Sequence, residues 1–348
     1  MNALYVEDLQ NCLNATLGLD KLSGKTLLIT GATGMIGRFI VDALMHANAT
    51  MQLGCTVVAM GRNAEKAKLR FADHWESDCF MFVEHDINNP MADTVPPADF
   101  IIHAASTTHP VAYASEPLST ITTNIFGVYH LLNYASTRCP NARLALASSV
   151  EVYGQNRGDA ASFDESYCGY IDCNTLRAGY PESKRLSESL CQAFMKEKGV
   201  DYVSARLPRT YGPTMLMSDT KALSQFIKKG IAGEDIVLKS AGTQFFTYAY
   251  VADAASGLLS VMLAGASGHA YNIAGLQSDI TLRDLALLVA SVCHTELRFE
   301  LPDSVEAAGY STATSAILAP EKLRDLGWSP QYSIERGISR TIQLLQKD

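Results

Sequence analysis

Residues 25–37 read KTLLITGATGMIG, a short apolar run that leads directly into a glycine-rich turn. The apolar run predicts a strand buried on both faces of a parallel sheet. The glycines allow a tight turn, a close approach of backbone to a pyrophosphate, and packing of the next helix on the strand. The helix expected over 35–46 turns its N–H groups and the positive end of its dipole towards that anion. This unit predicts a dinucleotide-binding site whose residues are Gly31, Gly34, Met35, Ile36 and Gly37.

The same alternation of strand and helix continues through the first two thirds of the chain. Further apolar, β-prone runs predict strands, and longer amphipathic stretches between them predict helices. The strands are expected at 56–60, 80–83, 100–104, 144–148 and 202–207, and the helices at 35–46, 117–136 and 179–198. Strand, helix and strand at this spacing indicate βαβ units, and so an α/β fold with a doubly wound parallel sheet of the Rossmann type.

The regular alternation of predicted strands and helices ends after residue 207. We expect helices at 220–232, after Asp253, and from near Thr281, Pro320 and Ser333, with short strands at 236–239, 271–274 and 297–301. This mixture predicts a smaller α+β lobe for the substrate. The predicted organisation is an extra helix in 1–20, the dinucleotide-binding domain in 21–207, and mainly the substrate lobe in 208–348, with 236–262 returning to the first domain.

The composition of the chain limits which partners it can bind and where in the cell it is expected. Lys and Arg together number 28 against 36 for Asp and Glu, a net charge of −8, which argues against nucleic acid as the main partner. No apolar run approaches the roughly 20 residues of a membrane helix, and the first ten residues carry acids where a signal peptide has bases. Eight cysteines without a C-x-x-C pair indicate reduced thiols in a cytoplasmic protein. No His or Cys cluster has metal-ligand spacing, so we expect no metal site.

The residues after the second strand bear on the choice of dinucleotide. An acidic residue there accepts hydrogen bonds from the adenosine ribose and selects NAD, but this chain has Gly61 followed by Arg62. Arg62 either pairs with the 2′-phosphate of NADP or stacks on adenine, so the sequence leaves NAD and NADP open. Asp86, after the third strand, is placed to bond the adenine amine, or else forms a turn.

Ser149, Tyr180 and Lys184 are the predicted catalytic residues. Tyr180 and Lys184 lie four residues apart, so they project from one face of a helix. The lysine charge, together with an oxidised nicotinamide, is expected to lower the tyrosine pKa from about 10 towards neutrality. Tyr180 would then take a proton from a substrate hydroxyl while hydride leaves for the nicotinamide. Ser149, at the carboxyl end of a strand, is placed to bond the same oxygen.

With these motifs in view, the chain resembles the extended short-chain dehydrogenase/reductases, the epimerase/dehydratase group that acts mostly on nucleotide sugars. The resemblance spans about residues 24–345 and is nearest to the UDP-glucuronate decarboxylases. It rests on TGATGMIG (30–37), HAAS (103–106), SSVEVYG (148–154), YPESK (180–184), RLPRTYGP (206–213) and YVADAASGL (250–258). It implies a tightly held NAD(P), transient oxidation of a sugar at C4, and return of the hydride to a later intermediate.

The resemblance also assigns residues. It implies that Glu151 lies beside the reacting sugar, where the alternative is a carboxylate tied to local backbone. The further dinucleotide contacts that it implies are Ile87, Ala104, Ala105, Ser106 and Asn124, with Tyr180 and Lys184. The substrate contacts that it implies are Thr107, Arg177, Arg209 and Thr210. It further implies a homodimer paired through the helices at 117–136 and 179–198.

Several positions depart from the pattern of this group. Val150 stands where 4,6-dehydratases carry an acidic Asp, which argues against dehydration. Phe246 and Thr314 stand where many relatives carry arginines that hold the sugar nucleotide, and Arg209 stands where relatives often have Asn. Arg209 is the predicted replacement for the lost charge, with Lys221 or Lys228 as weaker candidates.

Four functions remain open at this point. Glu151 favours decarboxylation of a UDP-glucuronate-like substrate, whereas Val150 and Thr314 favour C4 epimerisation. Gly61-Arg62 and Phe246 suggest an NADP-dependent reductase of a non-nucleotide substrate. A dinucleotide-sensing regulatory protein is the fourth, disfavoured because Ser149, Tyr180 and Lys184 are all present.

Overall fold

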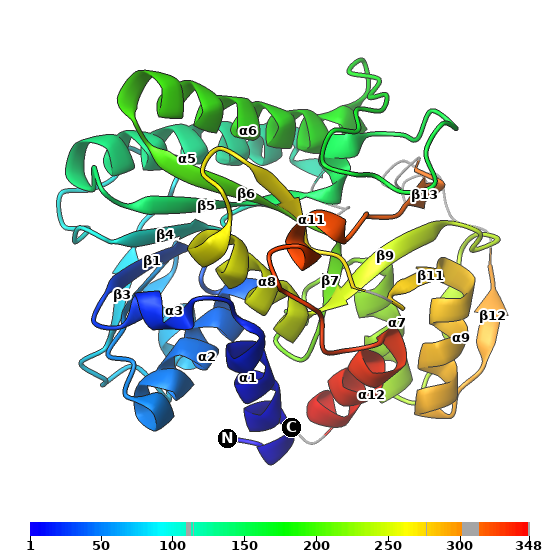
Figure 1. Ribbon diagram of the computed structural model, residues 1–348. Coiled ribbons are helices and arrows are strands. Elements are labelled where there is room, and N and C mark those ends of the chain that lie inside the picture. The colour runs from blue at the N-terminus through cyan, green and yellow to red at the C-terminus, as the bar shows by residue number, and fades with distance from the viewer. Residues whose placement is uncertain (109–112, 114, 276, 301–312, 347–348) are drawn as a thin grey trace.

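A seven-stranded parallel sheet forms the centre of the molecule (Figure 1). The computed structural model describes residues 1–108, 113, 115–275, 277–300 and 313–346. The strand order is β10-β6-β5-β4-β1-β2-β3. The strands are β1 (Thr26–Thr30), β2 (Thr56–Gly61), β3 (Phe80–Glu84), β4 (Phe100–His103), β5 (Arg143–Ser149), β6 (Asp201–Leu207) and β10 (Ala270–Asn272). Every pairing in this sheet is parallel, and this confirms the predicted fold class.

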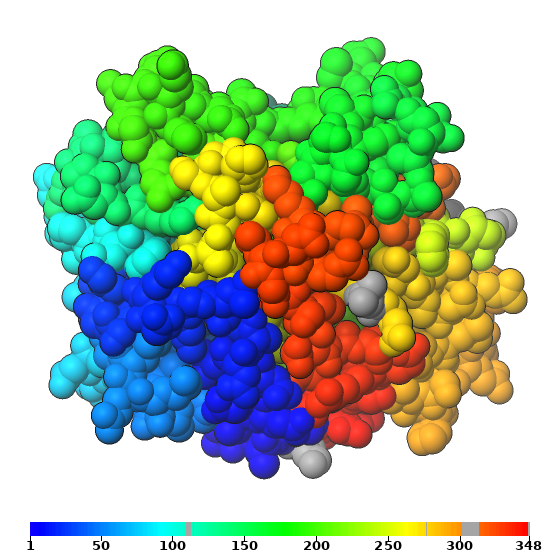
Figure 2. Space-filling model, viewed as in Figure 1, coloured from blue at the N-terminus to red at the C-terminus, as the bar shows by residue number. Residues whose placement is uncertain are grey.

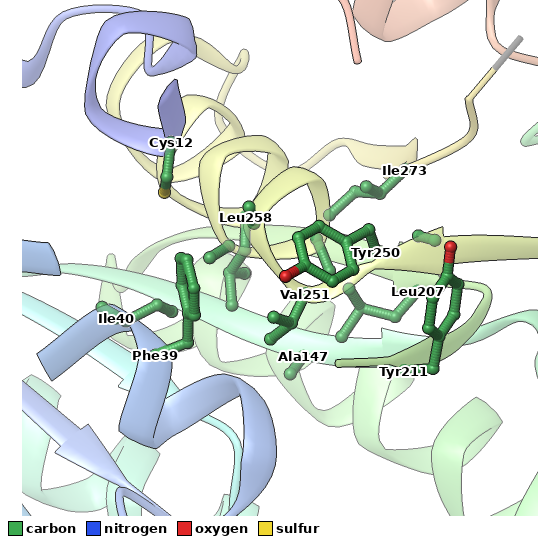
Figure 3. Packing of buried hydrophobic residues seen from close by; sticks show 14 of the residues in the cluster. Cys12, Phe39, Ile40, Ala147, Leu207, Tyr211, Tyr250, Val251, Leu258 and Ile273 are labelled. Atoms are coloured by element: carbon green, nitrogen blue, oxygen red, sulfur yellow. The ribbon is translucent and has the colours of Figure 1, made fainter. Parts of the chain in front are cut away.

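Helices cover both faces of the sheet, which is why its strands read as continuous apolar runs. On one face lie α5 (Pro117–Arg138) and α6 (Gly179–Lys198), which pack on each other. On the other face lie α1 (Ala3–Ala15), α2 (Met35–Met51) and α8 (Val251–Ala264). Figure 3 shows Cys12 of α1, Phe39 of α2 and Leu258 of α8 close together in this second layer. Short helix α3 (Ala64–Arg70) packs beside β3.

The second lobe is built on a smaller sheet. Its strands are β7 (Arg209–Tyr211), β9 (Phe245–Tyr250), β11 (Asp279–Thr281) and β13 (Ser315–Ala316). A separate parallel pair joins β8 (Ile236–Leu238) to β12 (Leu297–Phe299). The helices of this lobe are α7 (Ala222–Ile231), α9 (Leu282–Cys293), α11 (Glu321–Arg324) and α12 (Ile334–Leu345). Because β7 pairs with β9, the chain that leaves the large sheet at β6 enters the small one within two residues.

Two expectations about the later part of the chain were wrong. The strand placed in the second lobe at 271–274 is β10, which pairs with β6 and forms the edge of the large sheet. The return to the first domain expected over 236–262 starts later, because β8 and β9 both belong to the second lobe and α8 begins at Val251. Sequence pattern alone does not decide which sheet a three-residue strand joins.

The N-terminal helix ties the two lobes together. Instead of filling residues 1–20, α1 stops at Ala15, and a 3-10 turn, η1 (Leu19–Leu22), follows Gly18 with its φ of 68°. Asp8 on α1 is fully buried and accepts hydrogen bonds from the hydroxyls of Tyr250 (2.6 Å) and Tyr332 (2.7 Å). Arg340 of α12 forms an ion pair with the same carboxylate. In Figure 2 the first and last parts of the chain therefore meet on one face. No helix in the described ranges is long and apolar enough to cross a membrane.

Candidate functional site

The glycine-rich turn between β1 and α2 has room for backbone only. Gly31 has a φ of 69°, and a Cβ there would lie 2.6 Å from the backbone of Ala104 and Ala105. A Cβ at Gly37 would lie 2.6 Å from the Gly31 carbonyl oxygen. Gly34 precedes α2 without a side-chain cap, so the first N–H groups of the helix, at Met35, Ile36 and Gly37, are left for an outside acceptor. This cradle fits the pyrophosphate of a dinucleotide.

The region predicted to meet the adenosine is open. Arg62 is exposed where β2 ends, and a side chain at Gly61 would make only ordinary contacts, the nearest at 3.5 Å from Phe82. Asp86 accepts hydrogen bonds from the backbone and side-chain nitrogens of Asn88, at 3.0 and 2.9 Å, so it does form a turn. Ile87 is buried against Gly127 of α5.

The predicted contacts after β4 form a chain of hydrogen bonds. Ser106 donates to the Asn124 side-chain oxygen at 2.8 Å, and the Asn124 amide donates to the Ser183 hydroxyl at 2.8 Å. Asn124 is buried, and its carbonyl also accepts from Ser187 at 3.0 Å. Asn124 thus joins the loop after β4 to α5 and α6, and Ser106 acts to lower the pKa of Tyr180.

Tyr180 and Lys184 come together with Ser149 at the carboxyl end of β5. Tyr180 is 7% exposed, and the Ser149 side chain lies close enough to its hydroxyl to lower the pKa of Tyr180. The Lys184 Nζ lies 5.9 Å from the Tyr180 ring centroid and donates to the Ala147 carbonyl at 2.9 Å. These three side chains therefore meet as the sequence predicted, on α6 and the end of β5, where ligands bind in open α/β sheets.

Burial shifts the pKa values of Tyr180 and Lys184 in opposite directions. Burial raises the pKa of Tyr180 to about 12, with Glu151 adding to the rise and Ser149, Arg177 and Ser106 opposing it. Burial lowers the pKa of Lys184 to about 8. The residues of the chain thus keep Tyr180 protonated at neutral pH, and the expected fall of its pKa depends on the charge that an oxidised nicotinamide brings.

Two arginines face one carboxylate beside this group. Glu151, in the 3-10 turn η2 (Val150–Tyr153), accepts from Arg177 Nη2 through both oxygens at 3.0 Å. Arg209 Nη2 lies 3.9 Å from the same carboxylate. The Arg209 guanidinium also lies over the Phe246 ring, 3.4 Å from its centroid, which is the geometry of a cation–π contact. Phe246 therefore packs against the Arg209 cation, at the position where the resemblance implies an arginine.

Sequence reasoning missed Tyr113. Its ring stacks on Tyr180 with centroids 4.9 Å apart, and Arg177 lies 4.9 Å from the centroid of the Tyr113 ring. The side chains thus form one continuous column, in the order Tyr180, Tyr113, Arg177, Glu151, Arg209 and Phe246. The available signal was a lone aromatic residue in the stretch TTHPVAYASE (107–116) that follows HAAS.

The remaining predicted residues lie around this column or away from it. Thr107 lies in the loop after β4, and Thr210 on β7 donates to the Pro208 carbonyl at 3.2 Å. Lys221 pairs with Asp219 at 3.1 Å, and Lys228 donates to the carbonyls of Met217 and Asp219. Val150 is buried among apolar residues, and Thr314 is exposed, its carbonyl accepting from Phe245.

Comparisons with known proteins identify the family. The model of the NAD dependent epimerase/dehydratase family matches residues 27–274. The chain is 31% identical over 334 residues to UDP-glucuronic acid decarboxylase 1 of Danio rerio, covering 95% of this chain and 75% of the relative. It is 28% identical over 316 residues to UDP-glucuronic acid decarboxylase 6 of Arabidopsis thaliana, covering 91% and 87%.

A solved structure shows the same fold. The dTDP-glucose 4,6-dehydratase of Streptomyces venezuelae, solved with NAD, aligns with a TM-score of 0.80 at 24% identity, covering 93% of this chain and 97% of that one. The glycine cradle and the Ser149, Tyr180 and Lys184 cluster stand within the region that the family model matches. The chain belongs to the NAD-dependent epimerase/dehydratase family and is an enzyme that uses a nicotinamide dinucleotide.

Proposed function

We propose that the chain decarboxylates a nucleoside diphosphate uronic acid, UDP-glucuronate or a close analogue, through a ketone formed transiently at C4. The observation that carries this proposal is the surplus of positive charge beside Tyr180. Arg177 and Arg209 together face a single carboxylate, Glu151, and their side chains are 17% and 22% exposed. Among the described residues, two arginine cations therefore share one carboxylate.

Buried arginine N–H groups without hydrogen-bond acceptors also support an anionic substrate. Arg177 Nε and Nη1 and Arg209 Nη1 are buried without a hydrogen-bond partner among the described residues. Leaving a buried donor unsatisfied costs ~1–3 kcal/mol, and more for a charged group. An anionic group on the substrate would satisfy these donors by charge-assisted hydrogen bonds. The carboxylate of a uronic acid, which hangs from C5 next to the reacting C4, is such a group.

The chemistry then follows from where the side chains lie. Tyr180 takes the proton of the C4 hydroxyl as the carbon loses hydride, and Ser149 holds the same oxygen. When bound, the dinucleotide supplies the acceptor of that hydride and later its donor. The C4 ketone is β to the carboxylate, so the bond from C5 to the carboxylate breaks and carbon dioxide leaves. Its electron pair is held as an enolate at C4, and a proton taken from water is then added at C5. Tyr180 would return its proton to the C4 oxygen as hydride returns.

C4 epimerisation is the second candidate, favoured by Val150 and by Thr314 in place of an arginine. It shares the first step and differs in that the carbon skeleton stays intact. Mass spectrometry of products after separate incubations with UDP-glucuronate and UDP-glucose separates the two. Our proposal predicts a product of UDP-glucuronate lighter by one carbon dioxide. A product of unchanged mass, an isomer of the substrate, would instead show epimerisation and contradict the proposed decarboxylation.

Arg209→Gln tests the proposed role of the charge surplus. We expect the KM for UDP-glucuronate to rise ~10–100-fold, because a charge-assisted hydrogen bond contributes roughly 1.5–3 kcal/mol. Binding of UDP-glucose, which has no carboxylate, should change much less. Arg298→Gln, at an arginine exposed to 64%, is the matched control and should leave both values unchanged. Equal weakening of both sugars by Arg209→Gln would assign Arg209 to another part of the substrate.

We also propose that the chain forms a homodimer through α5 and α6. Large apolar side chains are exposed on these helices, among them Leu118 (76%), Phe126 (50%) and Tyr129 (46%) of α5 and Leu186 (43%) of α6. A monomer seldom leaves such residues grouped in water. Sedimentation equilibrium should give twice the chain mass, and Phe126→Lys should shift it towards one chain. A monomeric native protein would refute the pairing.

We also propose that the protein is located in the cytoplasm. None of the eight cysteines, all of them in the described ranges, forms a disulfide, and this supports the predicted reducing, cytoplasmic setting. Fractionation of cells with a cytoplasmic marker checks it.

A further inference from the structure

Glu188 lies one helical turn beyond Lys184 on α6, behind the proposed catalytic group. Its carboxylate accepts from the Ser148 hydroxyl at 2.5 Å and from Arg206 Nε at 3.1 Å through Oε1. Oε2 accepts from Arg206 Nη2 at 2.7 Å. The side chains of Glu188 and Arg206 are 17% and 13% exposed. Three hydrogen bonds therefore fix this carboxylate between β5, α6 and β6.

The ionisable groups around Lys184 make Glu188 its counter-charge. On α6 the other neighbour is Tyr180, which is neutral at physiological pH. On β4 it is His103, whose pKa is lowered to about 3 by burial and by Lys184, so it too is neutral. On β6 it is Arg206, which is ion-paired with Glu188 at 2.7 Å, so this one carboxylate offsets part of the positive charge of both cations. Burial lowers the pKa of Lys184, and Glu188 is the group that raises it.

Glu188 also fixes the end of β5. Ser148, its hydrogen-bond donor, immediately precedes Ser149. The Ser149 hydroxyl in turn accepts from the backbone nitrogen of Glu151 at 3.2 Å and acts to lower the pKa of Tyr180. The carboxylate thus acts on Lys184 through its charge and on Ser149 through the neighbouring residue.

We propose that Glu188, anchored by Arg206 and Ser148, is a positioning residue that holds the Lys184 ammonium charged and the Ser149 hydroxyl in place, without touching substrate or dinucleotide. The inference rests on the role that the proposed function gives to Lys184. A purely structural ion pair with Arg206 would stabilise the fold equally at every pH. A carboxylate that acts as counter-charge for Lys184 stabilises the fold only while Lys184 is protonated. The two roles therefore differ in how stability depends on pH, which can be measured without any substrate.

The test is urea unfolding of the wild type and Glu188→Gln at pH 6.5 and pH 9.5. Below about pH 8 the folded wild type carries a charged Lys184, so removing Glu188 lowers the Lys184 pKa and adds a penalty of about 1.4 kcal/mol for each unit of that fall. At pH 9.5 Lys184 is largely neutral in both proteins and this part of the penalty vanishes. We therefore expect the loss of stability to be clearly smaller at pH 9.5. A penalty that is the same at both values would overturn the proposal.

Glu182→Gln is the matched control, since Glu182 is on the same helix, 41% exposed, and lies 3.6 Å from Arg185. It should give a small penalty that does not change with pH. If Glu188→Gln does not fold, Glu188→Asp keeps the charge but draws it back by one methylene. It should show the same decrease of the penalty with pH on a smaller scale, and a constant penalty would again overturn the proposal.

Activity gives a second readout once a turned-over substrate is in hand. Loss of the Lys184 proton should end activity on the alkaline side. In Glu188→Gln we expect this alkaline limb of kcat to move about one unit to lower pH, with KM little changed, and Glu188→Asp to restore most of the shift. An unmoved limb contradicts the inference. A chain that turns over no uronic acid contradicts the proposed function instead and leaves the unfolding test intact.

Discussion

Tyr180→Phe is expected to reduce turnover of UDP-glucuronate by ~10²–10⁴-fold, the range typical of losing a general acid–base group. Only the hydroxyl is removed, the group whose pKa Ser149 and Ser106 act to lower. The ring keeps its place, because it is buried and stacked on Tyr113. Binding of the dinucleotide, measured by isothermal titration calorimetry, should therefore stay within a few fold of the wild type.

Tyr113→Phe provides the control for this prediction. It removes a hydroxyl from the neighbouring ring of the same stack, and no proton-transfer step is assigned to that hydroxyl. Its kcat should remain close to that of the wild type. A fully active Tyr180→Phe protein would remove Tyr180 from the chemistry.

Gly31→Ala should abolish dinucleotide binding and lower stability by more than ~2 kcal/mol. The added methyl group would lie 2.6 Å from the backbone of Ala104 and Ala105, which are themselves held by β4. The φ of 69° adds roughly 1–2 kcal/mol of strain for a residue with a side chain. Relief of the clash requires β1 and β4 to separate at the point where the pyrophosphate is expected to bind.

Gly24→Ala is the matched variant for this prediction. Gly24 has nearly the same φ, 65°, but a Cβ there has nothing within 4 Å. It should show only the backbone strain and bind the dinucleotide normally. Thermal unfolding and calorimetry of the two variants separate strain from collision. Normal binding by Gly31→Ala would contradict the assignment of the turn.

The order of elements in the large sheet could be predicted because the signals are local. The strand predicted at 26–30 is β1, the helix predicted at 179–198 is α6, and the remaining early strands differ by one or two residues at their ends. Buried parallel strands between amphipathic helices give the same pattern wherever they occur. The spacing of Tyr180 and Lys184 likewise fixed their common face, because helix geometry alone decides it.

What could not be predicted depends on contacts between distant parts of the chain. Arg209 on β7 stacks on Phe246 on β9, and these positions are far apart in the sequence. Only the folded structure shows that the arginine gained at 209 lies against the position 246 where an arginine was expected. Glu188 and Arg206 are on different elements, so their spacing in the sequence does not predict the ion pair between them. The raised pKa of Tyr180 follows from burial, which a helix pattern does not measure.

The proposed reaction releases the carboxylate next to a ketone formed at C4, with no net redox change. Its most direct test uses UDP-glucuronate labelled with carbon-13 in the carboxylate, followed by NMR in the presence of the dinucleotide, with absorbance recorded for reduced nicotinamide. We predict that the label moves entirely to carbon dioxide and bicarbonate while reduced nicotinamide does not accumulate. A label that stays in the sugar, or reduced cofactor that forms in step with product, would contradict the account.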